Sequence, residues 1–73
     1  MVDLGSKLQL LRKEKNTMQK DIASLLGLSV RAYQFYEKNE NEPNLSNLIK
    51  LADYFDVSLD YLVGRSDNPK INK

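Results

Sequence analysis

Residues 19–38 constrain the fold of this chain most, because an alanine and a glycine stand at a fixed spacing among apolar positions. If Gln19 is counted as position one, Ala23 is position five and Gly27 is position nine. Two helices that cross at about 90–120° through a short turn need a small side chain where their backbones approach, and Ala23 supplies it. Gly27 supplies the positive φ that such a turn requires. The pattern therefore predicts two short helices joined by a sharp turn.

The rest of the chain also has a helical period, and no stretch alternates at two residues for long enough to indicate a strand. Asp3 or Ser6 is expected to cap the first helix, and Ser29 and Ser58 to cap the third and fifth. The expected helical segments are Leu4–Leu11, Ile22–Leu26, Val30–Lys38, Leu45–Phe55 and Leu59–Val63. The fold class is therefore all-α, with five short helices in one domain at 4–64 and a polar tail at 65–73 that is expected to be flexible.

The composition excludes most small-enzyme chemistry. Cysteine and histidine are both absent, so the chain has no disulfide, no Cys or His nucleophile and no imidazole base. The three glycines are too scattered to form a phosphate-binding loop. We expect no catalysis, no cofactor and no metal. The sequence also shows no secretion leader and no apolar run near the roughly 18 residues of a membrane span, so we expect a cytoplasmic protein without a membrane partner.

The small overall charge of +1 conceals an uneven distribution. Residues 1–38 carry a net +3, residues 39–63 a net −4, and residues 64–73 a net +2. Such asymmetry favours a polyanionic partner at one end of the molecule. The alternative is that these charges simply solvate helix faces.

The order of these motifs resembles the phage repressor and Cro family, also called the XRE-type transcriptional regulators. The resemblance covers about residues 4–64 and implies a five-helix, lambda-repressor-like DNA-binding domain whose helix-turn-helix motif is about 19–38. The flanking motifs that carry the resemblance are Leu11-Arg12, Tyr36-Glu37, Pro43, Leu51–Phe55 and Val57–Gly64.

The resemblance implies that the third helix presents its start and outer face to the bases of DNA. These positions are held here by Ser29, Val30, Arg31, Gln34 and Phe35. Arg31 can pair with guanine O6 and N7, and Gln34 with adenine N6 and N7. Val30 or Phe35 can touch a thymine methyl. The alternative for Phe35 is packing on Met18 or on the fourth helix. Tyr33 and Tyr36 are expected in the core.

The same resemblance assigns phosphate contacts to Gln19, Lys38 and Arg12. Arg12 and Glu37 match a family ion pair that links the first helix to the end of the third. The alternatives are that Gln19 is an ordinary surface residue and that the ion pair is exposed and worth about 0–1 kcal/mol.

Two departures from the family pattern affect these expectations. Met18 stands where a Ser or Thr cap is usual, so Thr17 is expected to cap the second helix instead. The loop at 40–42 is acidic where basic residues often hold phosphate, which argues against tight, salt-resistant binding.

The predicted function is sequence-specific regulation of transcription, as a repressor that binds a palindromic operator in double-stranded DNA as a homodimer. The expected dimer interface holds Tyr54, Tyr61 and Val63, with the alternative that Tyr61 and Val63 complete the monomer core. The competing interpretation is an antitoxin-like protein-interaction module on the same fold, which the acidic loop and the low net charge favour.

Overall fold

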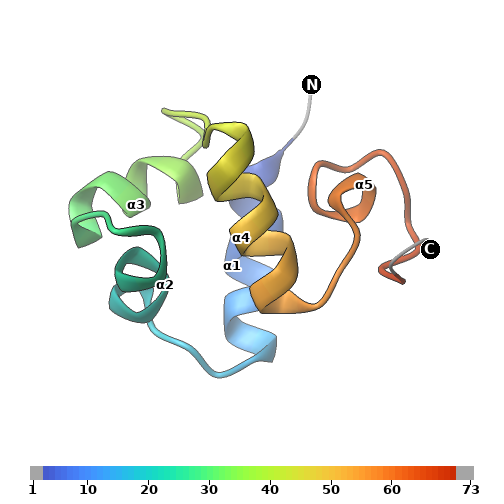
Figure 1. Cartoon of the computed structure of the whole chain (residues 1–73), viewed down its shortest axis with the longest axis horizontal. Coiled ribbons are helices and arrows are strands. Elements are labelled where there is room, and N and C mark those ends of the chain that lie inside the picture. Colours follow the sequence, from blue (N-terminus) through green and yellow to red (C-terminus); the bar gives the residue numbers. More distant parts are fainter. Residues whose placement is uncertain (1–2, 71–73) are drawn as a thin grey trace.

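The computed structural model describes residues 3–70, and within them the chain forms five helices and no strand (Figure 1). The helices are α1 (Leu4–Glu14), α2 (Gln19–Leu26), α3 (Val30–Glu37), α4 (Leu45–Phe55) and α5 (Leu59–Leu62). This confirms the all-α prediction, and each helix lies where the apolar stripes indicate. None of the helices in this part of the chain is both long and apolar enough to cross a membrane.

Short polar side chains fix where the helices begin. Asp3 accepts a hydrogen bond from the backbone N–H of Ser6 at 3.0 Å, and the Ser29 hydroxyl accepts one from Ala32 at 3.1 Å. Asn44 and Ser58 cap α4 and α5 in the same way. Each cap satisfies a backbone donor that has no partner inside the helix. The predicted caps at Asp3, Ser29 and Ser58 are confirmed.

The predicted cap of α2 is wrong. Met18 occupies the cap position, and the carboxylate of Asp21, three residues on, accepts from the Met18 backbone N–H at 2.9 Å. The Thr17 hydroxyl instead donates to the carbonyl of Arg12 at 3.2 Å. Thr17 therefore closes the end of α1, because it lies within reach of that helix's free carbonyl groups.

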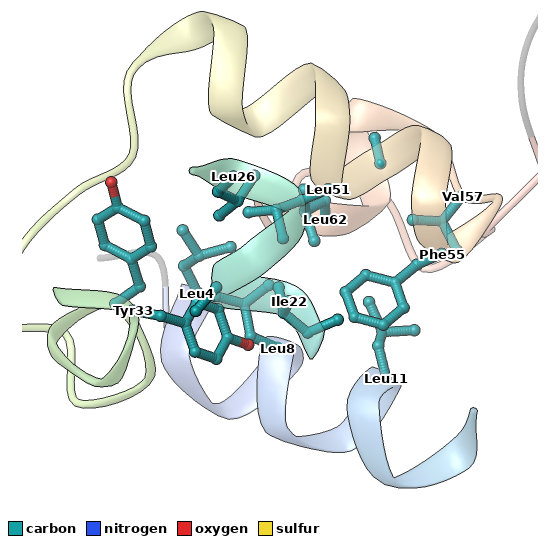
Figure 2. Close-up of a cluster of buried hydrophobic side chains, with 13 residues drawn as sticks. Leu4, Leu8, Leu11, Ile22, Leu26, Tyr33, Leu51, Phe55, Val57 and Leu62 are labelled. Atoms are coloured by element: carbon teal, nitrogen blue, oxygen red, sulfur yellow. The ribbon is translucent and has the colours of Figure 1, made fainter. Parts of the chain in front are cut away.

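One core joins all five helices. Its most buried side chains come one from each helix: Leu8, Ile22, Tyr33, Leu51 and Leu62 each have 0% of their surface exposed (Figure 2). Tyr33 and Tyr36 are both buried, as predicted, with their rings edge to face at 6.2 Å. These two rings anchor α3, so the opposite side of that helix faces solvent.

The first turn of α1 lies directly against the end of α3. A Cβ added at Gly5 would lie 2.3 Å from the carbonyl oxygen of Glu37, so only glycine fits there. Asn39, in the left-handed conformation with φ 60°, accepts from the Gly5 N–H at 2.9 Å and donates to Asp3 at 2.7 Å. Asparagine is, after glycine, the residue most often found in this left-handed conformation at the end of a helix. The close approach at Gly5 was not predicted.

The segment after α5 folds back over the domain. The backbone N–H of Ser58 donates to the carbonyl of Pro69 at 2.9 Å, and those of Arg65 and Ser66 donate to the carbonyl of Asp60. Pro69 lines a shallow hollow together with Phe55 and Tyr61. Residues 71–73 of the predicted tail lie outside the described residues.

Candidate nucleic-acid interface

The outer side of α3 gathers the residues predicted to contact bases. Positions 30 and 34 are one turn apart, as are 31 and 35, so the four residues share a side of the helix. Val30 and Arg31 are exposed, whereas Gln34 and Phe35 are half-buried. The Arg31 guanidinium lies 6.0 Å from the centre of the Phe35 ring, at the outer limit of a cation–π contact. Phe35 therefore lies on the same side of α3 as Arg31.

The turn before α3 has the geometry that the sequence predicts. Gly27 is left-handed with φ 69°, and the N–H of Leu28 donates to the carbonyl of Ala23 at 2.8 Å. Ala23 is 1% exposed, consistent with a close approach of the backbones. Only residues 27–29 separate the two helices. The turn thus sets the angle at which α3 projects from the domain.

Arg12 and Glu37 connect α1 to the end of α3. Arg12 Nε lies 2.8 Å from Glu37 Oε2, and Nη2 lies 3.3 Å from Oε1. Their side chains are only 18% and 5% exposed, so this is not the exposed pair of the alternative interpretation. Arg12 Nη1 also donates to the carbonyl of Thr17 at 3.3 Å. Three of the five guanidinium N–H groups are therefore used within the chain.

The electrostatics keep this pair ionised. Burial acts to raise the pKa of Glu37, but hydrogen bonds, chiefly the one from Arg12, lower it below its usual value. The hydrogen bond with Glu37 raises the pKa of Arg12. Burial also raises the pKa of the Tyr33 hydroxyl, and the neighbouring Glu37 carboxylate adds to this. The Tyr33 hydroxyl has no hydrogen-bond partner among the described residues.

Two glutamines extend from this pair to the recognition side of α3. Gln19 Nε2 donates to Glu37 Oε1 at 3.0 Å, and Gln34 Nε2 donates to Gln19 Oε1 at 3.0 Å. On the other side, Gln9 Nε2 donates to the Glu37 carbonyl at 3.0 Å. The structure thus brings together Gln19, predicted for phosphate, and Gln34, predicted for a base. Sequence spacing gave no signal for this contact, because the residues lie on different helices.

The residues predicted for the dimer interface are all half-buried, and Tyr54 and Tyr61 pack against the core. Lys7 Nζ lies 3.9 Å from the centre of the Tyr61 ring, and Lys15 Nζ lies 5.0 Å from that of Tyr54. Val63 lines a hollow of about 580 Å³, whose other lining residues are the apolar Leu4, Pro43 and Leu48 and the polar Asp3, Asn39, Asn41 and Glu42. The exposed apolar side chains on α4 and α5 include Leu45, Ile49 and Leu59, at 67%, 42% and 38% exposed.

Comparison with known proteins identifies the family. A family model described as Helix-turn-helix matches residues 8–62, which include all of α2 and α3. The chain belongs to the helix-turn-helix family. Its relatives place it in the phage repressor and Cro (XRE-type) group, as the motifs indicate. The alanine, glycine and apolar positions of 19–38 are the positions that build the motif's turn and core.

Several relatives are named transcriptional regulators or repressors. This helix-turn-helix chain is 40% identical over 60 residues to the uncharacterized regulator YqaE of Bacillus subtilis, covering 82% of this chain and 52% of the relative. It is 41% identical over 54 residues to the cryptic phage CTXphi transcriptional repressor RstR of Vibrio cholerae, covering 74% and 48%. The chain thus spans about half the length of these curated relatives.

A solved structure gives the same fold with DNA present. The P22 c2 repressor, crystallised in complex with synthetic operator 9T, superposes with a TM-score of 0.78 at 30% identity, covering 86% of this chain and 96% of that chain. A transcriptional regulator from Listeria innocua superposes with a TM-score of 0.84 at 36% identity, covering 88% and 60%. The lambda-repressor-like fold expected from the sequence is confirmed.

Proposed function

We propose that this chain regulates transcription by binding double-stranded DNA sequence-specifically with α3, as a repressor that occupies its operator without catalysis in the cytoplasm. The observation that carries the proposal is the outer side of α3, where Val30, Arg31, Gln34 and Phe35 project from a helix anchored by buried tyrosines. A helix of this kind fits the major groove, where arginine and glutamine can distinguish base pairs.

The proposed contacts divide into two kinds. Ser29, Val30, Arg31, Gln34 and Phe35 would face base edges and set the preferred sequence. Lys38 and the start of α2 at Gln19 would contact phosphate, the latter aided by the positive end of the helix dipole. Arg12 keeps at most two uncommitted N–H groups for a phosphate, so its larger role is to hold α3 in place through Glu37.

A homodimer on a palindromic site follows from the size of the interface. One short helix reads few base pairs, whereas specific regulators bind at about 10⁻⁸–10⁻¹¹ M. Two recognition helices roughly 34–36 Å apart reach such affinity by acting together. Among Tyr54, Tyr61 and Val63, the surroundings of Val63 support it best, because its hollow contains the apolar side chains of Leu4, Pro43 and Leu48, while a lysine lies over each tyrosine ring.

A second candidate function is an antitoxin-like protein-interaction module. The exposed Leu45 and Ile49 lie one turn apart on α4, next to the acidic loop at 40–42, and this pair favours a protein partner. Under this proposal the recognition side of α3 would carry no preference among DNA sequences.

Selection of bound duplexes from a random pool tests these proposals together. A palindromic consensus is expected, with two protomers per site by sedimentation. Val63→Asp should reduce this to one protomer without unfolding, whereas Val63→Ile should preserve both. One protomer bound at full affinity to a non-symmetric site would overturn the dimer alone. Failure to enrich any sequence would overturn DNA regulation and leave the protein-interaction module.

A further inference from the structure

We propose that the Arg12–Glu37 ion pair fixes the orientation of the Gln34 amide through Gln19, and that this chain of hydrogen bonds makes Gln34 prefer adenine over guanine. The inference deepens the proposed function and rests on it. It assigns Gln19 a role as a positioning residue, beyond any contact with phosphate.

The first link is the buried carboxylate. Glu37 is 5% exposed and accepts two hydrogen bonds from Arg12, which keep it ionised. An ionised carboxylate can only accept hydrogen bonds. Any side chain that reaches Glu37 Oε1 must therefore present a donor.

The second link is the Gln19 amide. Its Nε2 lies 3.0 Å from Glu37 Oε1, and its Oε1 points to Gln34. The reversed orientation would place the amide oxygen of Gln19 against the carboxylate oxygen, so two acceptors would face each other at hydrogen-bond distance. Glu37 thereby fixes the orientation of the Gln19 amide, whose oxygen, an acceptor, faces Gln34.

The third link is Gln34 itself. Its Nε2 donates to Gln19 Oε1 at 3.0 Å, which commits one of its two N–H groups. One N–H donor and the amide oxygen remain for DNA. Gln34 is half-buried, so its amide has limited freedom to adopt another arrangement.

The remaining donor and acceptor match one purine. Adenine presents N7 as an acceptor and N6–H as a donor in the major groove, so both groups of Gln34 can be used. Guanine presents two acceptors, O6 and N7. A free glutamine amide can offer both of its N–H groups to guanine, but Gln34 has only one left and would set its oxygen against O6.

The test compares purine preference at the base pair that Gln34 contacts. That base pair is located on the selected site as the one whose preference disappears in Gln34→Ala. For the unmodified chain, competition titrations should favour adenine over guanine there by roughly 5- to 150-fold, the range of a good bidentate contact. Gln19→Met keeps the side-chain length but removes both the donor and the acceptor of the amide, and should reduce this ratio at least about threefold. Glu37→Gln should also reduce it, because a neutral amide no longer dictates the orientation of Gln19.

Lys38→Gln provides the matched control, since it removes a phosphate contact and should lower affinity for every duplex while leaving the ratio unchanged. Thermal unfolding of each variant identifies any that do not fold, and Gln19→Met decides the case if Glu37→Gln is one of them. An unchanged ratio in Gln19→Met would show that Gln34 reads its base alone, which overturns the inference but leaves the proposed function. Unaltered base preference in Gln34→Ala would also overturn it. If the unmodified chain prefers no sequence, the proposed function fails and the inference fails with it.

Discussion

The two ends of this domain are held by different kinds of interaction. The junction of α1 and α3 is a set of directional bonds: the Arg12–Glu37 pair, and Asn39 between Asp3 and Gly5. The far end is α5, four residues long, held by the burial of Leu62 and by a lysine over Tyr61. Directional bonds fix a helix at one angle, whereas apolar burial is non-directional. A helix that contacts bases needs the directional bonds that fix its angle. A surface that contacts another copy of the chain tolerates support by apolar burial.

The largest expected effect comes from Gly5→Ala, which wedges a methyl group between α1 and α3. Overpacking against backbone should lower the free energy of unfolding by about 3 kcal/mol. The added Cβ would lie 2.3 Å from the Glu37 carbonyl oxygen, and backbone cannot easily move away. Urea unfolding measures the loss.

Two controls separate this clash from other effects of the substitution. Gly27→Ala meets no atom within 4 Å but keeps a positive φ, so it should cost about 1–2 kcal/mol. Ser6→Ala, an exposed change in the same helix turn, should stay within about 0.5 kcal/mol. A Gly5→Ala protein as stable as Ser6→Ala would break the comparison between the two ends.

The next effect concerns coupling within the junction. Arg12→Met and Glu37→Met should each lower the free energy of unfolding. The double variant should lose less than the sum of the two single losses, which corresponds to an interaction energy of about 1–2 kcal/mol. The reason is that either single variant leaves a mostly buried charge without its partner. A double-mutant cycle on unfolding free energies measures the interaction. Additive losses would mean that the two side chains act independently.

Acid should weaken the same junction. The folded pKa of Glu37 lies below its ordinary value of 4.5, so its stabilising contribution is complete above about pH 4.5 and is lost as the pH falls through the folded pKa. Glu37→Gln should therefore flatten the acid side of the stability profile. Glu42→Gln, in the exposed loop, is the control and should leave the Glu37 contribution in place. Equal profiles for the unmodified chain and Glu37→Gln would contradict this.

The smallest effect is expected at the α5 end. Lys7→Gln removes the cation that lies 3.9 Å from the Tyr61 ring and should cost about 0.5–1 kcal/mol, since the contact is partly exposed. Lys13→Gln on the same helix should have no measurable effect. Thermal melts compare the two. A loss from Lys7→Gln as large as that from Gly5→Ala would show that both ends are held with similar rigidity.

The sequence predicted what is local. The helices and most caps follow from apolar spacing and from residues such as Gly27 and Ser29, whose effect is confined to one turn. Thr17 was predicted wrongly because the side chain of Asp21, three residues after Met18, caps the backbone instead. The positions on the outer side of α3 were also accessible, because helical spacing alone separates them from Tyr33 and Tyr36.

The contacts between residues on different helices could not be predicted from spacing within one helix. The space at Gly5 depends on the position of the Glu37 carbonyl, and the Gln19–Gln34 contact depends on the angle between α2 and α3. Both are distances set by packing, which no spacing within a single segment encodes. The contact of Lys7 with the Tyr61 ring is of the same kind, since it depends on how α5 docks on α1.

The proposed function depends most directly on Arg31 of α3 reading a base while Lys38 contacts the DNA backbone. Titration of the selected duplex and its single-base variants, over a range of salt, measures both. Arg31→Ala should weaken the binding free energy for the preferred site by about 1–3 kcal/mol and relax discrimination at one base pair. Lys38→Ala should weaken all duplexes alike and flatten the salt dependence. An Arg31→Ala protein with unchanged affinity and unchanged base preference would contradict base recognition by this side of α3.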